Sequence, residues 1–282
     1  MDKTYRTIFI SDVHLGTKDC KAGHLNNFLK HNTCETLYLV GDIIDAWKIK
    51  QNKWRWKQSH TNVVRRVLGH AKRGTKVIYI LGNHDEFLRP YLHYGLGFGM
   101  LEVKNQCEHI GADGKHYLVT HGDLFDGITR LAPWLSILGD KAYDFVLSIN
   151  SRFNWFRHRL GFGYWSLSLY LKQRVKRAVD FMFQFEKNLA GYCKKKGFDG
   201  VICGHIHKAE IKEIDGVTYM NDGDWVESCT ALVEHHDGRW EIITWTEEND
   251  DGMDDDIDSS ASKRPKRSTR KNNTGVSRQT EL

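Results

Sequence analysis

Leu81-Gly82-Asn83-His84-Asp85 follows the apolar run Val77-Ile78-Tyr79-Ile80, and the interpretation of the whole chain starts from this stretch. A short run of β-branched, aliphatic and aromatic residues is typical of a strand buried on both faces of a parallel sheet. The Gly, Asn, His and Asp that follow place a turn and three polar side chains at the carboxyl end of that strand. Open α/β sheets bind their ligands there. Taken alone, the stretch would also suit an ordinary turn, because Gly and Asn are common turn residues.

The same arrangement, an apolar run that leads into polar residues, occurs four more times. The runs are 7–10, 36–40, 116–120 and 200–203. They lead into Asp12 and His14, Gly41-Asp42, His121-Gly122-Asp123, and Gly204-His205-Ile206-His207. If the chain stays extended after the first run, Asp12 and His14 project to the same side. Five strands that each deliver an oxygen or imidazole ligand are hard to explain by turns alone, so we expect one polar site at the edge of a sheet.

The side chains at these strand ends predict a metal site. An Asp and a His at one strand end could also form a structural hydrogen-bonded pair, but Asp, His and one Asn amide together suit two divalent ions of the Mn, Fe or Zn type. Two such ions ~3.5–4 Å apart support in-line displacement at phosphorus. A zinc finger is excluded because the cysteines form no Cys-x-x-Cys pair, and a Ser-His-Asp hydrolase because no Gly-x-Ser-x-Gly turn is present.

The segments between the polar strand ends predict a layered α/β domain. Helices are expected over 23–35 and 58–73, and residues 127–196 are expected to be mostly helical. Asp215-Gly216 and Asp237-Gly238 lie between alternating apolar strands, which is a strong hairpin signal. Strand–helix–strand units come first, then a helical block, then strands. This order predicts two sheets flanked by helices.

Composition limits the class of protein. The chain has 282 residues, of which 40% are hydrophobic, enough for a sizeable core. No apolar stretch approaches the ~20 residues that span a membrane, and the start does not resemble a secretory signal. The six cysteines suggest no disulfide framework, so we expect a reducing cytoplasm.

Residues 247–282 form an acidic and then a basic tail with almost no apolar residues, which predicts disorder. The basic run could bind nucleic acid or anionic lipid, but a solvated tail is favoured.

Together the five motifs resemble the signature of the calcineurin-like metallophosphoesterases over residues 10–207. The resemblance implies a four-layer αββα sandwich with a dinuclear metal site. His84, oriented by Asp85, would stabilise charge on the phosphoryl group or protonate the leaving oxygen. The metals would be two divalent ions, with Mn²⁺ favoured and Fe or Zn as alternatives. The implied ligands are Asp12, His14 and His207 for the first ion, Asn83, His121 and His205 for the second, and Asp42 for both.

Within that family, the stretches 41–47 and 121–126 and a helical insertion before Gly204 look like UDP-2,3-diacylglucosamine diphosphatase and its close relatives. The resemblance implies hydrolysis of a nucleotide-linked lipid precursor to lipid X and UMP during lipid A synthesis, in the cytoplasm at the inner face of the inner membrane. One position differs, because the best-known members have Arg where this chain has His84. Three alternatives stay open: another phosphodiester substrate, a nuclease, and a non-catalytic scaffold. The last is disfavoured because no ligand position is missing.

The insertion of about 127–196 is aromatic and basic. It carries twelve basic and four acidic residues between 127 and 195, a larger excess than the +5 of the entire chain. Packing of an amphipathic helical hairpin on the core would account for about half of its aromatics. The rest predict an apolar, cationic cap for acyl chains and phosphates, or for an anionic membrane surface. Asp126, Lys172 and Lys176 are the expected substrate-binding residues, with Lys172 and Lys176 one helical turn apart. Nucleic acid is a disfavoured partner, and the sequence leaves the oligomeric state open.

Overall fold

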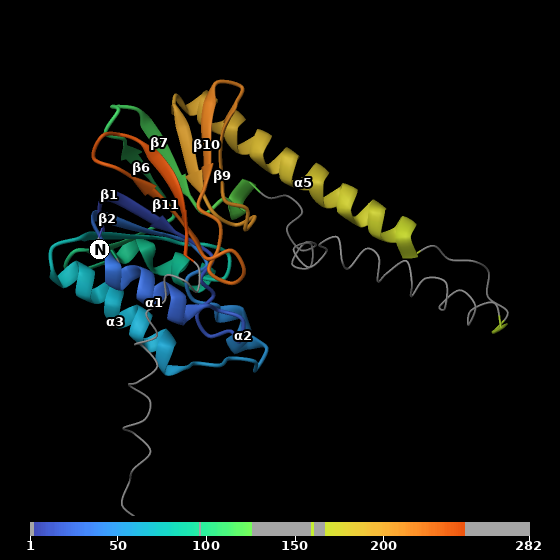
Figure 1. Cartoon of the computed structure of the whole chain (residues 1–282), viewed down its shortest axis with the longest axis horizontal. Helices are drawn as coiled ribbons and strands as arrows, with labels where there is room; N and C mark the ends of the chain where they lie inside the picture. The colour runs from blue at the N-terminus through green and yellow to red at the C-terminus, as the bar shows by residue number, and fades with distance from the viewer. Residues whose placement is uncertain (1–2, 96, 126–158, 161–166, 246–282) are drawn as a thin grey trace, which may run out of the picture.

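Two β-sheets face each other, with helices on their outer faces, in the computed structural model, which describes residues 3–95, 97–125, 159–160 and 167–245 (Figure 1). The first sheet has the strand order β12-β11-β1-β2-β3-β5-β4, and the second has the order β6-β7-β8-β10-β9. The strands of the first sheet are β12 (Trp240–Thr244), β11 (Thr230–Glu234), β1 (Lys3–Ile10), β2 (Asn32–Val40), β3 (Lys76–Ile80), β5 (Leu101–Lys104) and β4 (Gly97–Phe98). Those of the second are β6 (Gln106–Ile110), β7 (His116–Thr120), β8 (Gly200–Cys203), β10 (Val217–Asn221) and β9 (Glu210–Ile214).

Parallel strands form the centre of each sheet. β1, β2, β3 and β5 run parallel in the first sheet, and β7, β8 and β10 run parallel in the second. Parallel neighbours need crossover connections, and these contain helices between β1 and β2, between β2 and β3 and before β8, whereas β9 lies between β8 and β10. The helices are α1 (Ala22–His31), α2 (Ala46–Lys50), α3 (Gln58–Lys72) and α5 (Leu167–Lys196), with 3-10 turns η1 (Glu86–Tyr94) and η2 (Asp123–Phe125).

The alternation of side chains along each strand produces three apolar layers. On β2, Leu37 and Leu39 face α1 and α3, whereas Tyr38 and Val40 face the second sheet. The second sheet turns its other face to α5, against which Leu118 of β7 packs. The result is helix, sheet, sheet, helix, so the predicted four-layer αββα sandwich is confirmed.

The predicted elements are mostly found with small shifts at their ends. All five predicted strands are present, and both Asp-Gly hairpins form, as β9–β10 and β11–β12. The helix expected over 58–73 is α3. The helix expected over 23–35 ends at His31, because Asn32 already pairs with Lys3 of β1 and the chain continues as β2. The tail 247–282 lies outside the described residues.

The helix at the carboxyl end of the expected insertion also packs on the main fold. Most of the block before Leu167 lies outside the described residues. The second half of α5 belongs to the main fold, because Phe185, Leu189 and Cys193 are buried against the second sheet. The helix extends beyond the sheet at its amino-terminal end (Figure 1). The last turns of α5 thus form the fourth layer of the sandwich, and the bounds of the insertion stay a prediction.

A buried ionic network joins the two sheets away from the polar strand ends. Glu234 of β11 is fully buried, and its carboxylate lies 2.5 Å from Arg6 Nη1 of β1 and 3.0 Å from His109 Nε2 of β6. It also accepts hydrogen bonds from the Thr7 hydroxyl (2.8 Å) and from the Ala112 backbone N–H (2.6 Å). Burial acts to raise the pKa of Glu234, but these partners hold it at about 2. The network therefore stabilises the packing of one sheet on the other.

All six cysteines are free thiols in the described part of the chain. Five of them are buried, and burial raises the pKa of the Cys20, Cys34, Cys193 and Cys229 thiols. They therefore contribute to packing rather than to cross-linking. Within the described residues, no helix combines the length and the apolarity needed to cross a bilayer.

Candidate metal centre

The polar residues that the sequence singles out come from the ends of both sheets. Three of the loops follow β1, β2 and β3 of the first sheet, and two follow β7 and β8 of the second. Asp12 N–H donates to Gly41 O (3.1 Å) within the first sheet, and His205 N–H of the second sheet donates to Asp12 Oδ2 (2.8 Å) of the first. The expected site at the edge of one sheet is therefore formed where two facing sheets meet.

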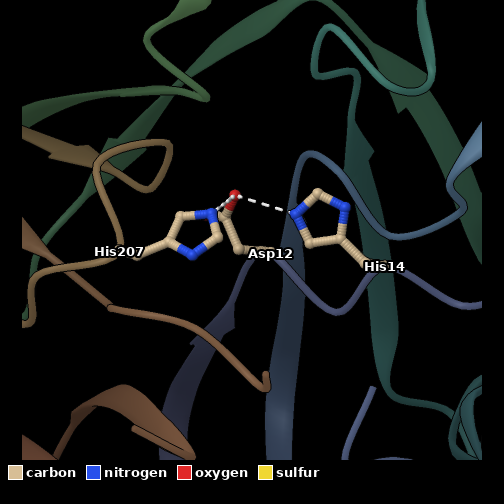
Figure 2. Close-up of side chains that lie close together, drawn as sticks. All are labelled: Asp12, His14 and His207. Carbon is tan, nitrogen blue, oxygen red and sulfur yellow. Dashed lines mark ion pairs between the residues drawn. The ribbon is translucent and has the colours of Figure 1, made fainter. Parts of the chain in front are cut away.

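Asp12, His14 and His207 form the first group of potential ligands, shown in Figure 2. Asp12 Oδ1 lies 3.0 Å from His207 Nε2 and 3.7 Å from His14 Nε2, so both imidazoles point at the same carboxylate oxygen. One donor atom from each residue lies within 4.8 Å of the others. A carboxylate oxygen and two imidazole nitrogens this close together suit a divalent transition-metal ion. These are the three residues expected to hold the first ion.

Asp42, His121 and His205 form the second group. His121 Nε2 lies 3.4 Å from Asp42 Oδ2 and 3.3 Å from His205 Nδ1. The other ring nitrogen of His121, Nδ1, is 2.8 Å from the Val40 carbonyl oxygen. This contact requires a proton on Nδ1, so the neutral ring has its lone pair on Nε2, toward the site, as in a metal-ligating histidine.

Five of the seven expected ligands adopt left-handed backbone conformations. Their φ values are 50° for Asp12, 51° for His14, 53° for Asp42, 73° for His205 and 55° for His207. Such values are uncommon outside glycine and persist only where the surroundings enforce them, which is typical of functional sites. The extended path expected between Asp12 and His14 is therefore wrong. Their side chains converge because the loop turns sharply at both residues.

Glycines allow the loops to approach the ligands closely. A Cβ at Gly82 would lie 2.6 Å from the Asp42 backbone nitrogen, and one at Gly204 would lie 2.6 Å from Asp12 Oδ2. Gly41 has φ of +87° and stands against the His121 ring, where a Cβ would collide with it. These glycines directly precede Asp42, Asn83 and His205. The lack of room for a Cβ explains why glycine occupies the position before each of these potential ligands.

Unpaired atoms and ionisation both fit a bound cation. Asn83 Oδ1 is buried and accepts no hydrogen bond from the described residues, and buried Asp12 Oδ1 faces the His207 and His14 ring nitrogens without a hydrogen bond of good geometry. Buried polar atoms are rarely left unpaired, and a metal ion would satisfy both of these. Burial acts to raise the pKa of Asp42, but the His121 imidazole holds it at about 2. Burial acts likewise on Asp12, and His207 and His121 hold its pKa well below the usual value. Both carboxylates are therefore ionised at neutral pH, as metal ligands must be.

His84 lies beside both groups and forms a third group of potential ligands with His14 and Asp45, although it is not in the expected ligand set. Its Nε2 is 3.8 Å from Asp42 Oδ2, and its Nδ1 is 3.0 Å from Asp45 Oδ1. The Trp47 ring stacks on the imidazole with 4.1 Å between centroids and 28° between planes. One nitrogen thus lies beside a carboxylate at ion-pair distance, without a hydrogen bond of good geometry, and the other faces the site.

Asp85 does not orient His84, which corrects the expectation from the sequence. Its buried carboxylate accepts hydrogen bonds from the backbone N–H groups of Ile43 (3.1 Å) and Ile44 (2.9 Å). It therefore fixes the loop that carries Asp42. Burial, together with the nearby charge of Asp42, raises the pKa of Asp85 to about 6. The partner of His84 is Asp45, three residues beyond Asp42 in the motif Gly41-Asp42-Ile43-Ile44-Asp45.

Ser11 and Asp222 support Asp12 and were not found from the sequence. Ser11 Oγ lies 2.7 Å from Asp12 Oδ2 and 2.5 Å from Asp222 Oδ1. A hydroxyl has one proton to donate, so contact with two carboxyl groups requires a proton on one of them. Burial and the nearby charge of Asp12 raise the pKa of Asp222, which marks it as the protonated one. Asp222-Gly223-Asp224 follows directly after β10, which ends at Asn221, so the pattern of polar strand ends could have revealed Asp222.

Most of the structure around the expected substrate-binding residues is outside the described part of the chain. Asp126 lies outside the described residues. Lys172 is part of α5, but its side chain is not among those described. Lys176 is exposed on the same helix. Among these three side chains the structure describes only that of Lys176, so the assignment of all three to the substrate stays a prediction.

Comparisons with known proteins agree with this geometry. A family model described as calcineurin-like phosphoesterase matches residues 5–209. The chain is 31% identical over 121 residues to UDP-2,3-diacylglucosamine hydrolase of Blochmanniella pennsylvanica, over 42% of this chain and 46% of that protein. It therefore spans less than half the length of that relative. The protein of the same name from Neisseria meningitidis serogroup B is 24% identical over 244 residues, over 80% of this chain and 92% of that protein.

Solved structures of similar proteins include two phosphoesterases. One is an archaeal phosphodiesterase, with a TM-score of 0.40 and 13% identity over 84% of this chain and 98% of that chain. Another is a phosphoesterase from E. coli, with a TM-score of 0.38 and 15% identity over 85% of this chain and 99% of that chain.

Proposed function

The chain belongs to the calcineurin-like phosphoesterase family, and we propose that it hydrolyses the diphosphate of UDP-2,3-diacylglucosamine to lipid X and UMP. The observation that carries this substrate assignment is the 244-residue similarity to a protein named for that hydrolysis, which covers 92% of the relative. The site supports the reaction type, since it combines two groups of Asp and His donors. The proposal places the protein in the cytoplasm at a membrane surface, acting in lipid A synthesis.

The two donor groups would each hold one divalent ion, for which Mn²⁺ is our first choice. Asp12, His14 and His207 would hold one ion, and Asp42, His121 and His205 the other. Asn83 would add its unpaired amide oxygen, and Asp42 would contact both ions. When bound, such ions polarise phosphoryl oxygens and lower the pKa of a coordinated water toward neutrality.

His84 would act on the phosphoryl group or the leaving oxygen. Asp45 lies against Nδ1, and Trp47 covers one ring face, so the imidazole has a fixed orientation. Nε2 then points toward the ligands and can donate a hydrogen bond to a phosphoryl oxygen or a proton to the departing group. Because the side chain is held on two sides, little reorganisation is needed when charge develops on the substrate.

Lys172 and Lys176 are proposed to bind the anionic part of the substrate, and Asp126 its polar part. Both lysines belong to α5, whose amino-terminal end projects past the second sheet (Figure 1). A projecting helix with exposed cations suits a diphosphate and sugar whose acyl chains lie elsewhere. Replacement of both lysines by Ala should therefore reduce turnover of the lipid substrate more than turnover of a small diester.

A different phosphodiester is the second candidate substrate. His84 occupies a position where the best-known diacylglucosamine diphosphatases have Arg, whereas His at this position is typical of the wider family. An imidazole can protonate a leaving oxygen at neutral pH, which a guanidinium cannot. This difference favours chemistry on a substrate with a poorer leaving group, such as a simple nucleotide or lipid diester.

The test is a hydrolysis screen with purified protein and Mn²⁺. The substrates are UDP-2,3-diacylglucosamine, nucleotide diesters, a small chromogenic diester and single- and double-stranded nucleic acid. We expect the largest kcat/KM for UDP-2,3-diacylglucosamine, with UMP and lipid X as products. A higher kcat/KM for a nucleotide diester or nucleic acid would refute the substrate assignment while leaving the family assignment intact.

A further inference from the structure

The segment that contains α2 and α3 has a one-sided charge. Between residues 46 and 84 the sequence contains ten basic residues and no Asp or Glu. The ten are Lys48, Lys50, Lys53, Arg55, Lys57, Arg65, Arg66, Lys72, Arg73 and Lys76. The excess is twice the net charge of +5 of the whole chain. It is separate from the basic residues of the helical insertion.

Six of these cations are exposed and unpaired within the described part of the chain. Lys53, Arg55 and Lys57 lie on the loop between α2 and α3, and Arg65, Lys72 and Arg73 lie on α3 and at its carboxyl end. None of the six forms an ion pair with a described residue, whereas Lys76 contacts Glu102. Unpaired cations on one surface produce a positive potential that attracts anionic partners. We call this surface, residues 47–73, the α2–α3 face.

The α2–α3 face also exposes large apolar side chains. Ile49 is 56% exposed, Leu68 is 49% exposed and Trp56 is 39% exposed. Leu68 lies three residues after Arg65 and four before Lys72, so the three share one face of α3. Trp56 stacks on Trp54 with 5.2 Å between centroids, and its Nε1 donates to the Thr61 hydroxyl. Apolar and cationic side chains are therefore interleaved across the same surface.

This surface begins at the edge of the metal centre. Trp47, in the first turn of α2, stacks on His84. The loop beyond α2 lies over the turn that follows His14, because Arg55 N–H donates to Gly16 O (2.8 Å) and a Cβ at Gly16 would collide with the Trp54 ring. A partner bound to the α2–α3 face would thus lie beside the donor groups.

We propose that the α2–α3 face binds the surface of an anionic lipid bilayer. Cations attract anionic head groups, while exposed Trp and aliphatic side chains enter the boundary between head groups and acyl chains. A duplex nucleic acid would use the cations but gains nothing from exposed Ile49 and Leu68, which is why a bilayer is the better match. This assignment rests on the proposed function, because it assumes that the substrate is a lipid. A bilayer bound to the α2–α3 face would present such a substrate beside the metal centre.

The test measures vesicle binding without catalysis. A negative result would therefore count against the membrane-binding surface and not against the substrate assignment. The full-length protein is mixed with vesicles of equal parts phosphatidylglycerol and phosphatidylcholine, or of phosphatidylcholine alone, and sedimented. We expect binding to the anionic vesicles only, weakened by salt because screening shortens the range of the attraction. Each cation near an anionic surface contributes roughly fivefold in affinity, so the triple variant Arg65→Gln, Lys72→Gln, Arg73→Gln should bind about 100-fold more weakly.

A matched control removes the same charge elsewhere. Lys115, Lys195 and Lys196 are exposed and lie outside the α2–α3 face, and their replacement by Gln should leave vesicle binding within about twofold of the parent. A further variant, Ile49→Ser, should weaken vesicle binding about tenfold and leave duplex DNA binding unchanged, because only a bilayer buries the apolar side chain. Thermal unfolding of each variant checks its fold.

Three results would overturn the proposal. The first is no binding of the parent to anionic vesicles. The second is an equal loss in the triple variant and in the control, which would mean that net charge alone is responsible. The third is tighter binding to duplex DNA than to vesicles with the loss confined to the triple variant, which would assign the face to nucleic acid.

Discussion

Gly204 provides a steric test of the metal centre. Gly204 is the residue before His205, and it lies against the side chains that position Asp12. An ideal Cβ at this residue would be 2.6 Å from Asp12 Oδ2 and would overlap Ser11 Oγ. Neither atom belongs to the free end of a long side chain, and both are buried. We therefore expect Gly204→Ala to displace the Asp12 carboxylate from its present position.

The size of the effect follows from the distances. A carbon–oxygen contact needs about 3.3 Å, so relief of the 2.6 Å contact requires a shift of roughly 0.7 Å. Metal–ligand distances vary by only about 0.2 Å, so a shift of that size removes or weakens one ligand. Loss of ligand positioning typically lowers metal affinity ~10–100-fold. The overpacked site should also lower the free energy of unfolding of the metal-free protein by about 1–3 kcal/mol.

The assay is a calorimetric titration of metal-free protein with Mn²⁺. Thermal unfolding of the metal-free form is measured separately. Gly191→Ala is the control, because Gly191 lies in α5 with no atom within 4 Å of an added Cβ. Ala is favoured over Gly inside a helix by roughly 1 kcal/mol, so this variant should be as stable as the parent or more so, with parental Mn²⁺ affinity. A Gly204→Ala protein that bound Mn²⁺ as tightly as the parent would refute the assignment of Asp12 and its supporting residues to a metal site.

Three further predictions concern charged residues. Asp42→Ala should remove both ions, because this carboxylate, 3.4 Å from His121 Nε2, is the ligand expected to contact both; metal analysis that still found the parental content would contradict a shared ligand. His84→Ala should lower kcat ~10²–10³-fold at unchanged metal content, and Asp45→Asn about tenfold, measured on a chromogenic diester; loss of metal in the first variant would instead make His84 a ligand. Glu234→Gln should lower the free energy of unfolding at pH 7 by about 3 kcal/mol, by breaking a buried network. The pKa of Glu234 is held at about 2 against an ordinary 4.5, so its ionisation stabilises the parent fully above pH 4.5 and less as the pH falls toward 2. The Gln variant should lose less stability over that range, and parallel pH profiles would show that the network does not act through this ionisation.

Much of the fold could be predicted because it depends on short-range patterns. The uninterrupted apolar run Leu37-Tyr38-Leu39-Val40 already indicates a strand buried on both faces. The structure places Leu37 and Leu39 in one apolar layer and Tyr38 and Val40 in another. The end of the helix after His31 could not be predicted in this way. Residues 32–35 have no strong local preference, and pairing with Lys3 of β1 determines their conformation.

The sequence by itself determined which chemical groups the protein brings together, because each potential ligand directly follows a strand and the strand pattern is local. It did not determine how those groups face one another. Asp45 rather than Asp85 contacts His84, and Ser11 bonds to Asp222 across 211 residues of chain. Such pairings depend on loop paths, here with left-handed backbone at Asp12, His14 and Asp42, that only the packing of two sheets can enforce. The sequence specifies the residue types at the strand ends, whereas the contacts that orient them arise from segments that meet only in the folded protein.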